Sequence, residues 1–164
     1  MIVKVTLSLA KSTANTAYDQ LPEGNKEERF LSWALDHEFR DARLSPLGIE
    51  QCMSSQPIVN QLKIHTIMVS PLRRTLETAY NVYKTHPNFD KIKFLVVPAL
   101  RECLNTTSDI PIHIEETIRE FRDLIPQLDF SLFDEFEEQA TLLLRDYELR
   151  SKRSRQITLS SKGW

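Results

Sequence analysis

Short apolar runs alternate with longer amphipathic segments along the chain. The runs Met1–Leu9, Ile64–Val69 and Lys93–Val97 are rich in β-branched residues and are short enough to be strands. Helical spacing predicts helices over residues 27–36, from 46 to the residue before Pro57, and over 72–84, 114–124 and 133–151, with a last short strand at 157–160. This alternation predicts an α/β fold with a largely parallel sheet. Because no repeat or Gly/Ser linker interrupts it, we expect one domain over residues 1–164.

Two Ser-Pro pairs mark predicted helix starts. Ser45-Pro46 and Ser70-Pro71 each combine a capping hydroxyl with proline at the first helical position. Pro57 is expected to end the first of these helices, because proline lacks the amide hydrogen that a helix interior uses. His65 lies inside the second apolar run, where we expect a packed or hydrogen-bonded core histidine.

Composition restricts the chemistry. Three glycines in 164 residues are few against an average usage of about 7%. A glycine-rich phosphate cradle is therefore excluded, and any phosphate chemistry must use side chains. The net charge of -2 gives no indication of a basic surface that would bind nucleic acid. No apolar stretch approaches the length of a membrane span. No His or Cys pair has metal-ligand spacing, so we expect neither metal nor cofactor.

Two cysteines are too few for a disulfide scaffold and fit a reducing compartment. We therefore expect an intracellular protein, cytoplasmic by default. A mitochondrial location is the alternative, since the segment through Tyr18 lacks acids and carries Lys4 and Lys11.

Three segments carry a more specific signal: Asp41–Gln51 (DARLSPLGIEQ), Val69–Ala79 (VSPLRRTLETA) and Ala99–Glu102 (ALRE). In order and spacing they resemble the histidine phosphatase superfamily, also called phosphoglycerate-mutase-like. The resemblance implies a three-layer αβα sandwich around a largely parallel sheet. It also implies a phosphohistidine cycle, in which a histidine after the first strand attacks phosphorus. Arginines and a second histidine hold the phosphate oxygens, and a loop acid protonates the leaving group.

Part of this machinery has counterparts here. By the resemblance, Arg74 falls on a phosphate-binding arginine, Glu102 on the loop acid, and Asn15 on the asparagine that follows the nucleophile motif. Gly48 and Gly163 also fall on glycine positions of the family's motifs.

The catalytic histidines have no counterparts. Ser8 stands where the family has arginine, and Leu9 stands where it has the nucleophilic histidine. In the last segment, Ile157–Trp164 (ITLSSKGW), Lys162 stands at the position of the second histidine. Leucine cannot form a nitrogen–phosphorus bond. The chain ends soon after Lys162, so we expect a C-terminally shortened version of the fold.

These replacements predict a pseudoenzyme that acts as a structural or protein-binding subunit, with protein partners or self-association. One alternative is an anion- or phosphate-binding module in which Arg74, Lys11 and Lys162 supply the charges and Asn15 is a further donor. Another is a phosphatase or mutase with residual or rearranged activity, for which Ser8 and Cys103 are the candidate nucleophiles.

Overall fold

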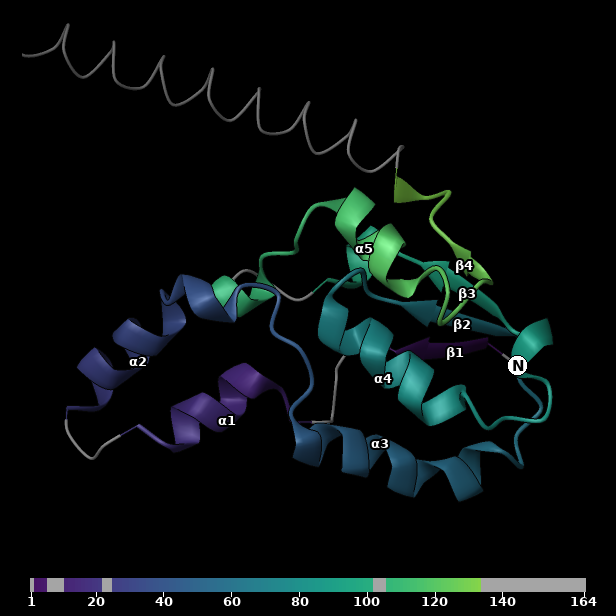
Figure 1. Cartoon of the computed structure of the whole chain (residues 1–164), viewed down its shortest axis with the longest axis horizontal. Coiled ribbons are helices and arrows are strands. Elements are labelled where there is room, and N and C mark those ends of the chain that lie inside the picture. The colour runs from purple at the N-terminus through teal and green to yellow at the C-terminus, as the bar shows by residue number, and fades with distance from the viewer. Residues whose placement is uncertain (1, 6–10, 22–24, 102–105, 134–164) are drawn as a thin grey trace, which may run out of the picture. The chain divides into compact units, whose positions relative to one another are not determined.

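The computed structural model describes residues 2–5, 11–21, 25–101 and 106–133 (Figure 1). The chain divides into two units, Met1–Phe130 and Ser131–Trp164. All the helices and strands given below belong to the first unit. The expected strand at 157–160 and the expected helix at 133–151, apart from its first residue, lie outside the described residues. A single domain over the whole chain stays a prediction.

In the part of the chain that the structure describes, four parallel strands form the sheet: β1 (Ile2–Val5), β2 (Thr66–Val69), β3 (Lys93–Val96) and β4 (Leu128–Asp129). Their order in the sheet is the order of the sequence, and every adjacent pair is parallel. The last residues of the first three strands are in register, so their carboxyl ends lie at one edge. This confirms the predicted α/β class with a parallel sheet. The two-residue β4 was not predicted.

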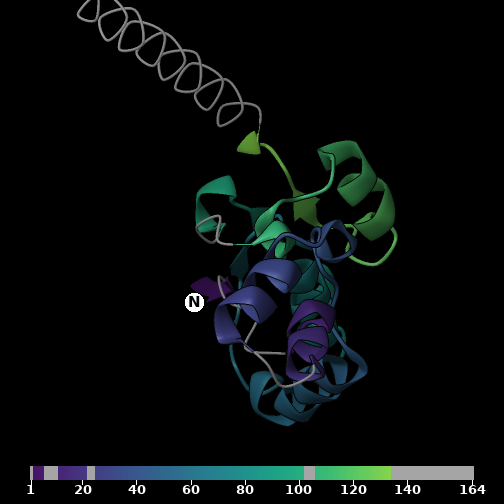
Figure 2. The ribbon, with the colours of Figure 1, turned by 90° about the vertical axis from the view of Figure 1, so that its left-hand side faces the viewer.

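Within the described ranges, five α-helices accompany the sheet: α1 (Thr13–Asp19), α2 (Lys26–Ala34), α3 (Pro46–Val59), α4 (Arg73–Tyr83) and α5 (Ile114–Phe121). Four short 3₁₀ turns join them, η1 (His37–Phe39), η2 (Phe89–Lys91), η3 (Pro98–Leu100) and η4 (Thr107–Asp109). α1 and α2 lie side by side in both ribbon views (Figures 1 and 2). The Trp33 indole donates to the Ala14 carbonyl at 2.7 Å and joins this pair.

Alternating burial along the strands places the core. In β2 and β3, the side chains of Ile67, Val69, Phe94 and Val96 are fully buried, while the residues between them are partly or fully exposed. α4 contributes Leu76 to the same core, and α3 packs against α4 (Figure 1). This packing fixes the start of α4 just beyond the carboxyl end of β2.

Two local predictions were wrong. α3 continues through Pro57 to Val59. Pro57 lies on the exposed side of the helix, two residues before its end, so water can bond the Met53 carbonyl that proline leaves unpaired. His65 is exposed rather than packed in the core. The buried histidine is His86, which bonds the Leu62 carbonyl at 3.0 Å and the Asn88 amide at 3.1 Å.

The predicted cap of α4 was also wrong. The helix begins at Arg73 after Leu72, and no side chain of the cap residue bonds its first turn. Ser70 lies too early to serve as the N-cap. A carboxylate from a distant segment takes its place.

Candidate functional site

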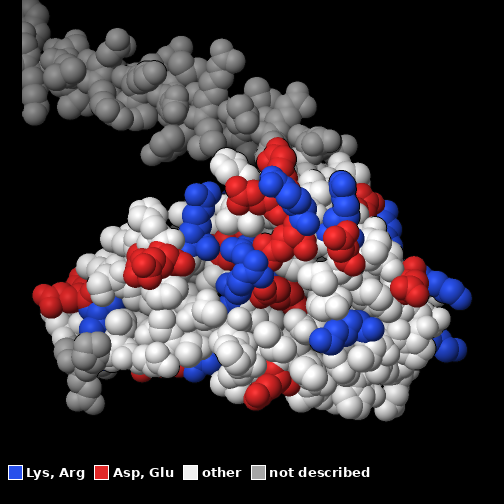
Figure 3. All heavy atoms as spheres, viewed as in Figure 1, with Lys and Arg blue, Asp and Glu red and all other residues white. Residues whose placement is uncertain are grey.

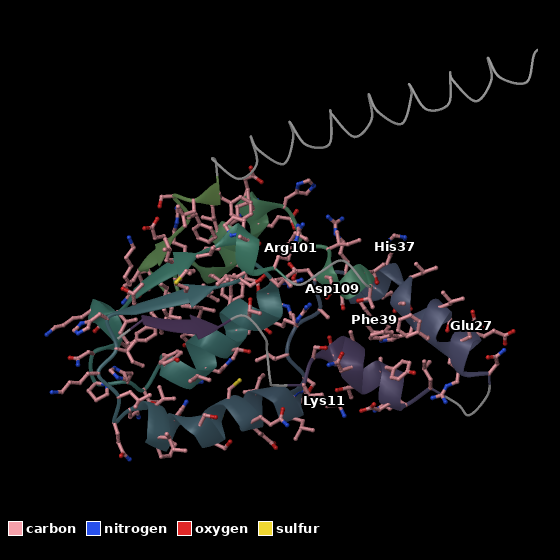
Figure 4. The ribbon with its side chains drawn as sticks, turned by 180° about the vertical axis from the view of Figure 1, so that it is seen from behind. Lys11, Glu27, His37, Phe39, Arg101 and Asp109 are labelled. Atoms are coloured by element: carbon pink, nitrogen blue, oxygen red, sulfur yellow. The ribbon has the colours of Figure 1, made fainter. Side chains whose placement is uncertain are left out.

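The carboxyl edge of the sheet gathers the segments that carry the motifs. Open α/β sheets bind their ligands at this edge. We call Asp41, Arg73, Arg74 and Asp109 the carboxyl-end cluster. Asp41 opens the first motif, the two arginines open α4, and Asp109 ends η4. Figure 4 shows Asp109 beyond the sheet edge towards which the strands run.

Arg74 forms a buried ion pair in this cluster. Its Nη2 lies 2.9 Å from Oδ1 of Asp109, and the two side chains are only 8% and 7% exposed. Nη1 also donates to the Ser108 carbonyl at 2.6 Å. The other oxygen of Asp109 accepts from the Thr106 amide at 3.0 Å. The guanidinium therefore holds the loop that follows β3 against the first turn of α4.

Asp41 supplies the missing cap of α4. Its Oδ1 accepts from the Arg73 amide at 2.8 Å, and its Oδ2 accepts from the Ile112 amide at 3.1 Å. The side chain is fully buried, and the backbone has φ 47°, in the left-handed region. One carboxylate thus joins the first motif, the helix start and the segment after η4. Burial raises the pKa of Asp41, and the two amides and the charges of Arg73 and Arg74 oppose that rise.

The raised pKa of Asp41 gives a pH prediction for Asp41→Asn. The native state holds the Asp41 proton to a higher pH than the unfolded chain does, whose pKa is near 3.8. The contribution of Asp41 to stability is therefore fully present below that value and is lost as pH rises through the folded pKa. The asparagine of the variant does not titrate, so its stability lacks this pH dependence at position 41. The stability difference between wild type and variant should be larger near pH 4 than near pH 7.

Urea unfolding of both proteins across this pH range measures the difference. Asp90→Asn, at an exposed aspartate, is the matched control for the loss of one carboxylate. A difference between wild type and Asp41→Asn that stays constant or grows with pH would contradict the prediction.

Further ion pairs surround the cluster. Arg43 lies 2.6 Å from a carboxylate oxygen of Glu77 on α4 and 2.6 Å from one of Glu120 on α5. Arg73 lies 3.2 Å from the same Glu120 carboxylate. With Asp41 and the pair Arg74–Asp109, three arginines therefore meet four carboxylates. Figure 3 shows blue and red side chains interleaved over this part of the surface. Among these described residues the carboxylates outnumber the guanidinium groups.

The structure places two more predicted site residues apart from this ion pair. The side chain of Lys11 pairs with Asp19 of α1, and Asn15 is exposed on α1. The backbone of Lys11 is fixed instead to the start of α3. Its carbonyl accepts from the Ser45 amide at 2.9 Å and from the Ser45 hydroxyl at 2.8 Å.

The remaining predicted site residues, Ser8, Leu9, Glu102, Cys103 and Lys162, lie outside the described residues. Asp41 and Asp109 were not predicted as site residues, although each carried a signal. Asp41 opens the first motif. Thr106 and Asp109 have the Thr-x-x-Asp spacing of a capping box, which the structure contains. Within the described ranges, no three His, Cys, Asp or Glu side chains are grouped so that they could hold a metal ion. Among the same residues no helix is long and apolar enough to cross a bilayer.

Comparison with known proteins adds one match. A family model described as Histidine phosphatase superfamily (branch 1) matches residues 23–127, more than half of the chain. No curated protein and no solved structure matches the chain. The matched range contains the segments of Asp41, Arg74 and Asp109. It does not contain Leu9 or Lys162.

Proposed function

Because this chain belongs to the histidine phosphatase superfamily, we propose that it is a non-catalytic member that acts as a structural or protein-binding subunit of a larger assembly. The proposal assigns the cluster at the sheet edge to the stability of the fold. It assigns the interactions of the subunit to surfaces elsewhere on the molecule.

The ion pair between Arg74 and Asp109 carries this proposal. Arg74 stands where the resembled family has a phosphate-binding arginine, and here its charge is neutralised by a buried carboxylate. An entering phosphate would compete with Asp109 for the Arg74 guanidinium and would break this buried ion pair, at a cost of about 3–5 kcal/mol. Asp41 at the start of α4 adds a second negative charge within the same cluster. Phosphate binding at this position is therefore disfavoured.

The residue at the nucleophile position supports the same conclusion independently. Leu9 has no lone pair with which to attack phosphorus, and Lys162 replaces the second histidine of the resembled motif. Phosphoryl transfer depends on positioned charges as well as on a nucleophile. In this proposal, Asp109 neutralises the charge of Arg74, and Leu9 leaves the site without a nucleophile.

A phosphatase assay tests the proposal. We expect the purified full chain to hydrolyse an aryl phosphate no faster than the buffer background. Arg74→Ala is the matched control, because a contaminating phosphatase would be unaffected by a substitution in this chain. Turnover well above background that disappears in a folded Arg74→Ala protein would overturn the proposal.

Titration with inorganic phosphate separates the proposed role from an anion-binding module. We expect no saturable phosphate binding tighter than about 1 mM, because the Arg74 guanidinium is already paired with the Asp109 carboxylate. Calorimetry or a thermal shift in phosphate measures this, with sodium chloride at equal ionic strength as the control. Saturable micromolar binding that a folded Arg74→Ala protein lacks would favour the anion-binding module instead.

A further inference from the structure

The carboxylate of Asp109 is bound as a free anion would be in a binding site. Its Oδ1 accepts from Nη2 of Arg74 at 2.9 Å. Its Oδ2 accepts from the Thr106 amide at 3.0 Å and from the Thr106 hydroxyl at 3.2 Å. A guanidinium, a backbone amide and a hydroxyl are groups with which proteins bind oxyanions. We call these groups of Arg74 and Thr106 the donor set, and the anion that the donor set holds belongs to the chain itself.

The donor set is held in place by bonds that do not involve the carboxylate. Thr107 Oγ1 donates to the Asp36 carbonyl at 2.6 Å, and η4 lies against η1 (Figure 4). Nη1 of Arg74 donates to the Ser108 carbonyl at 2.6 Å. The hydroxyls of Thr106 and Ser108 are 2.7 Å apart. Because these bonds remain when the carboxylate is removed, the loop should keep its path and present the same donors.

We propose that Asp109 is an internal ligand of Arg74, which closes a site for a small carboxylate to anions from solution. The inference rests on the proposed function, since it states how the position that would bind an anion is kept closed. The side chains of Arg74 and Asp109 are both more than nine-tenths buried, so an external anion must take the place of the Asp109 carboxylate. A ligand fixed on the same chain binds without the loss of translational freedom that a free anion has to overcome. The donor set is therefore filled in the wild type whatever anion the buffer contains.

The group that a substitution removes defines the external ligand. Asp109→Ala removes the carboxylate and keeps Cβ, so the missing group has the size and charge of formate. Acetate carries an additional methyl group, which would overlap the Cβ that alanine keeps. Asp109→Gly removes Cβ as well, and acetate then matches the missing atoms. The alanine variant should therefore prefer formate over acetate, and the glycine variant should prefer acetate over formate.

Thermal unfolding of the full chain in sodium formate tests the inference. Formate should raise the unfolding temperature of Asp109→Ala in a saturable way, relative to sodium chloride at equal ionic strength. We expect a Kd of about 1 mM or weaker, because so small a ligand makes few contacts. At about ten times this Kd, bound formate raises the ratio of folded to unfolded protein about elevenfold. The same titration with acetate should give the larger shift for Asp109→Gly.

Three control proteins separate the site from general effects of the salt. The wild type should show no shift specific to formate, because its own carboxylate fills the donor set. Asp109→Asn should show none either, because the amide group fills the same space without the charge. Arg74→Met/Asp109→Ala has the space but lacks the guanidinium, so it should also fail to respond to formate.

If Asp109→Ala does not fold in chloride, refolding in formate should restore the circular dichroism of the wild type. The inference is overturned if formate stabilises a folded Asp109→Ala protein no more than chloride does, or fails to restore an unfolded one. A formate response of equal size in Arg74→Met/Asp109→Ala would also overturn it. Turnover of an aryl phosphate by the wild type, together with the expected formate response, would overturn only the proposed function. An inactive wild type without the formate response would overturn only the inference.

Discussion

Replacing Arg74 with methionine is expected to lower the free energy of unfolding by about 3–5 kcal/mol. The substitution keeps much of the apolar stem but removes the guanidinium, so Asp109 becomes a buried charge without its arginine. The Ser108 carbonyl loses a donor at the same time. Urea unfolding followed by circular dichroism measures the change. Arg73→Met is the matched control, because Arg73 is 20% exposed and pairs with the partly exposed Glu120. It should cost less than Arg74→Met, because Glu120 keeps its ion pair with Arg43.

A double-mutant cycle isolates the pair itself. Asp109→Asn keeps an acceptor for the Thr106 amide while removing the charge. The double variant Arg74→Met/Asp109→Asn should therefore be more stable than the sum of the single changes implies, by about 1–3 kcal/mol. Additive effects, or a small effect of Arg74→Met, would mean that the ion pair between Arg74 and Asp109 does not stabilise the fold. The anion-binding alternative would then gain support.

The same measurements bear on how an arginine at a motif position is interpreted. An arginine at a phosphate-binding position is usually taken as a sign of phosphate binding. In this chain the same residue connects two segments 35 positions apart and is satisfied by a resident carboxylate. A charged residue can thus match a catalytic motif while its contacts stabilise the fold. Stability measurements distinguish the two roles more directly than the motif does.

The sequence predicted β2, β3 and α4 to within two residues at each end. β3 begins at Lys93 as expected and ends one residue before the predicted limit, because short β-branched runs are a strong strand signal. β2 begins at Thr66 rather than Ile64. α1 was missed because its seven residues are mostly polar and have no apolar periodicity. Whether Pro57 faces solvent depends on tertiary packing, which the local sequence pattern does not determine.

The candidate site was predictable to a similar extent. The motifs predicted that the segments of Asp41 and Arg74 belong to one site. The hydrogen bond from the Arg73 amide to Asp41 confirms that these two segments are in contact. The partner of Arg74 was not predicted, since many carboxylates follow it in the sequence. Which one reaches it depends on the path of the loop after β3. The expected contributions of Lys11 and Asn15 to anion binding stay predictions.

Gly48→Ala is expected to destabilise the protein by about 3 kcal/mol or more, although alanine is the better helix former. Helix propensity alone favours alanine over glycine by about 1 kcal/mol. A Cβ at this position, however, would lie 2.2 Å from the Lys11 carbonyl oxygen and 3.1 Å from its carbonyl carbon. That carbonyl cannot retreat without losing its bonds to the Ser45 amide and hydroxyl. The steric cost therefore exceeds the gain in propensity.

Ser54→Ala on the exposed side of the same helix separates the two effects. It changes propensity in the same direction and meets no backbone, so it should alter the free energy of unfolding by no more than about 0.5 kcal/mol. Urea unfolding of the two variants provides the comparison. If Gly48→Ala were as stable as the wild type, the segment at Lys11 would not be held against α3. The contact between the N-terminal segment and the first motif, which Lys11 and Ser45 make, would then be absent in solution.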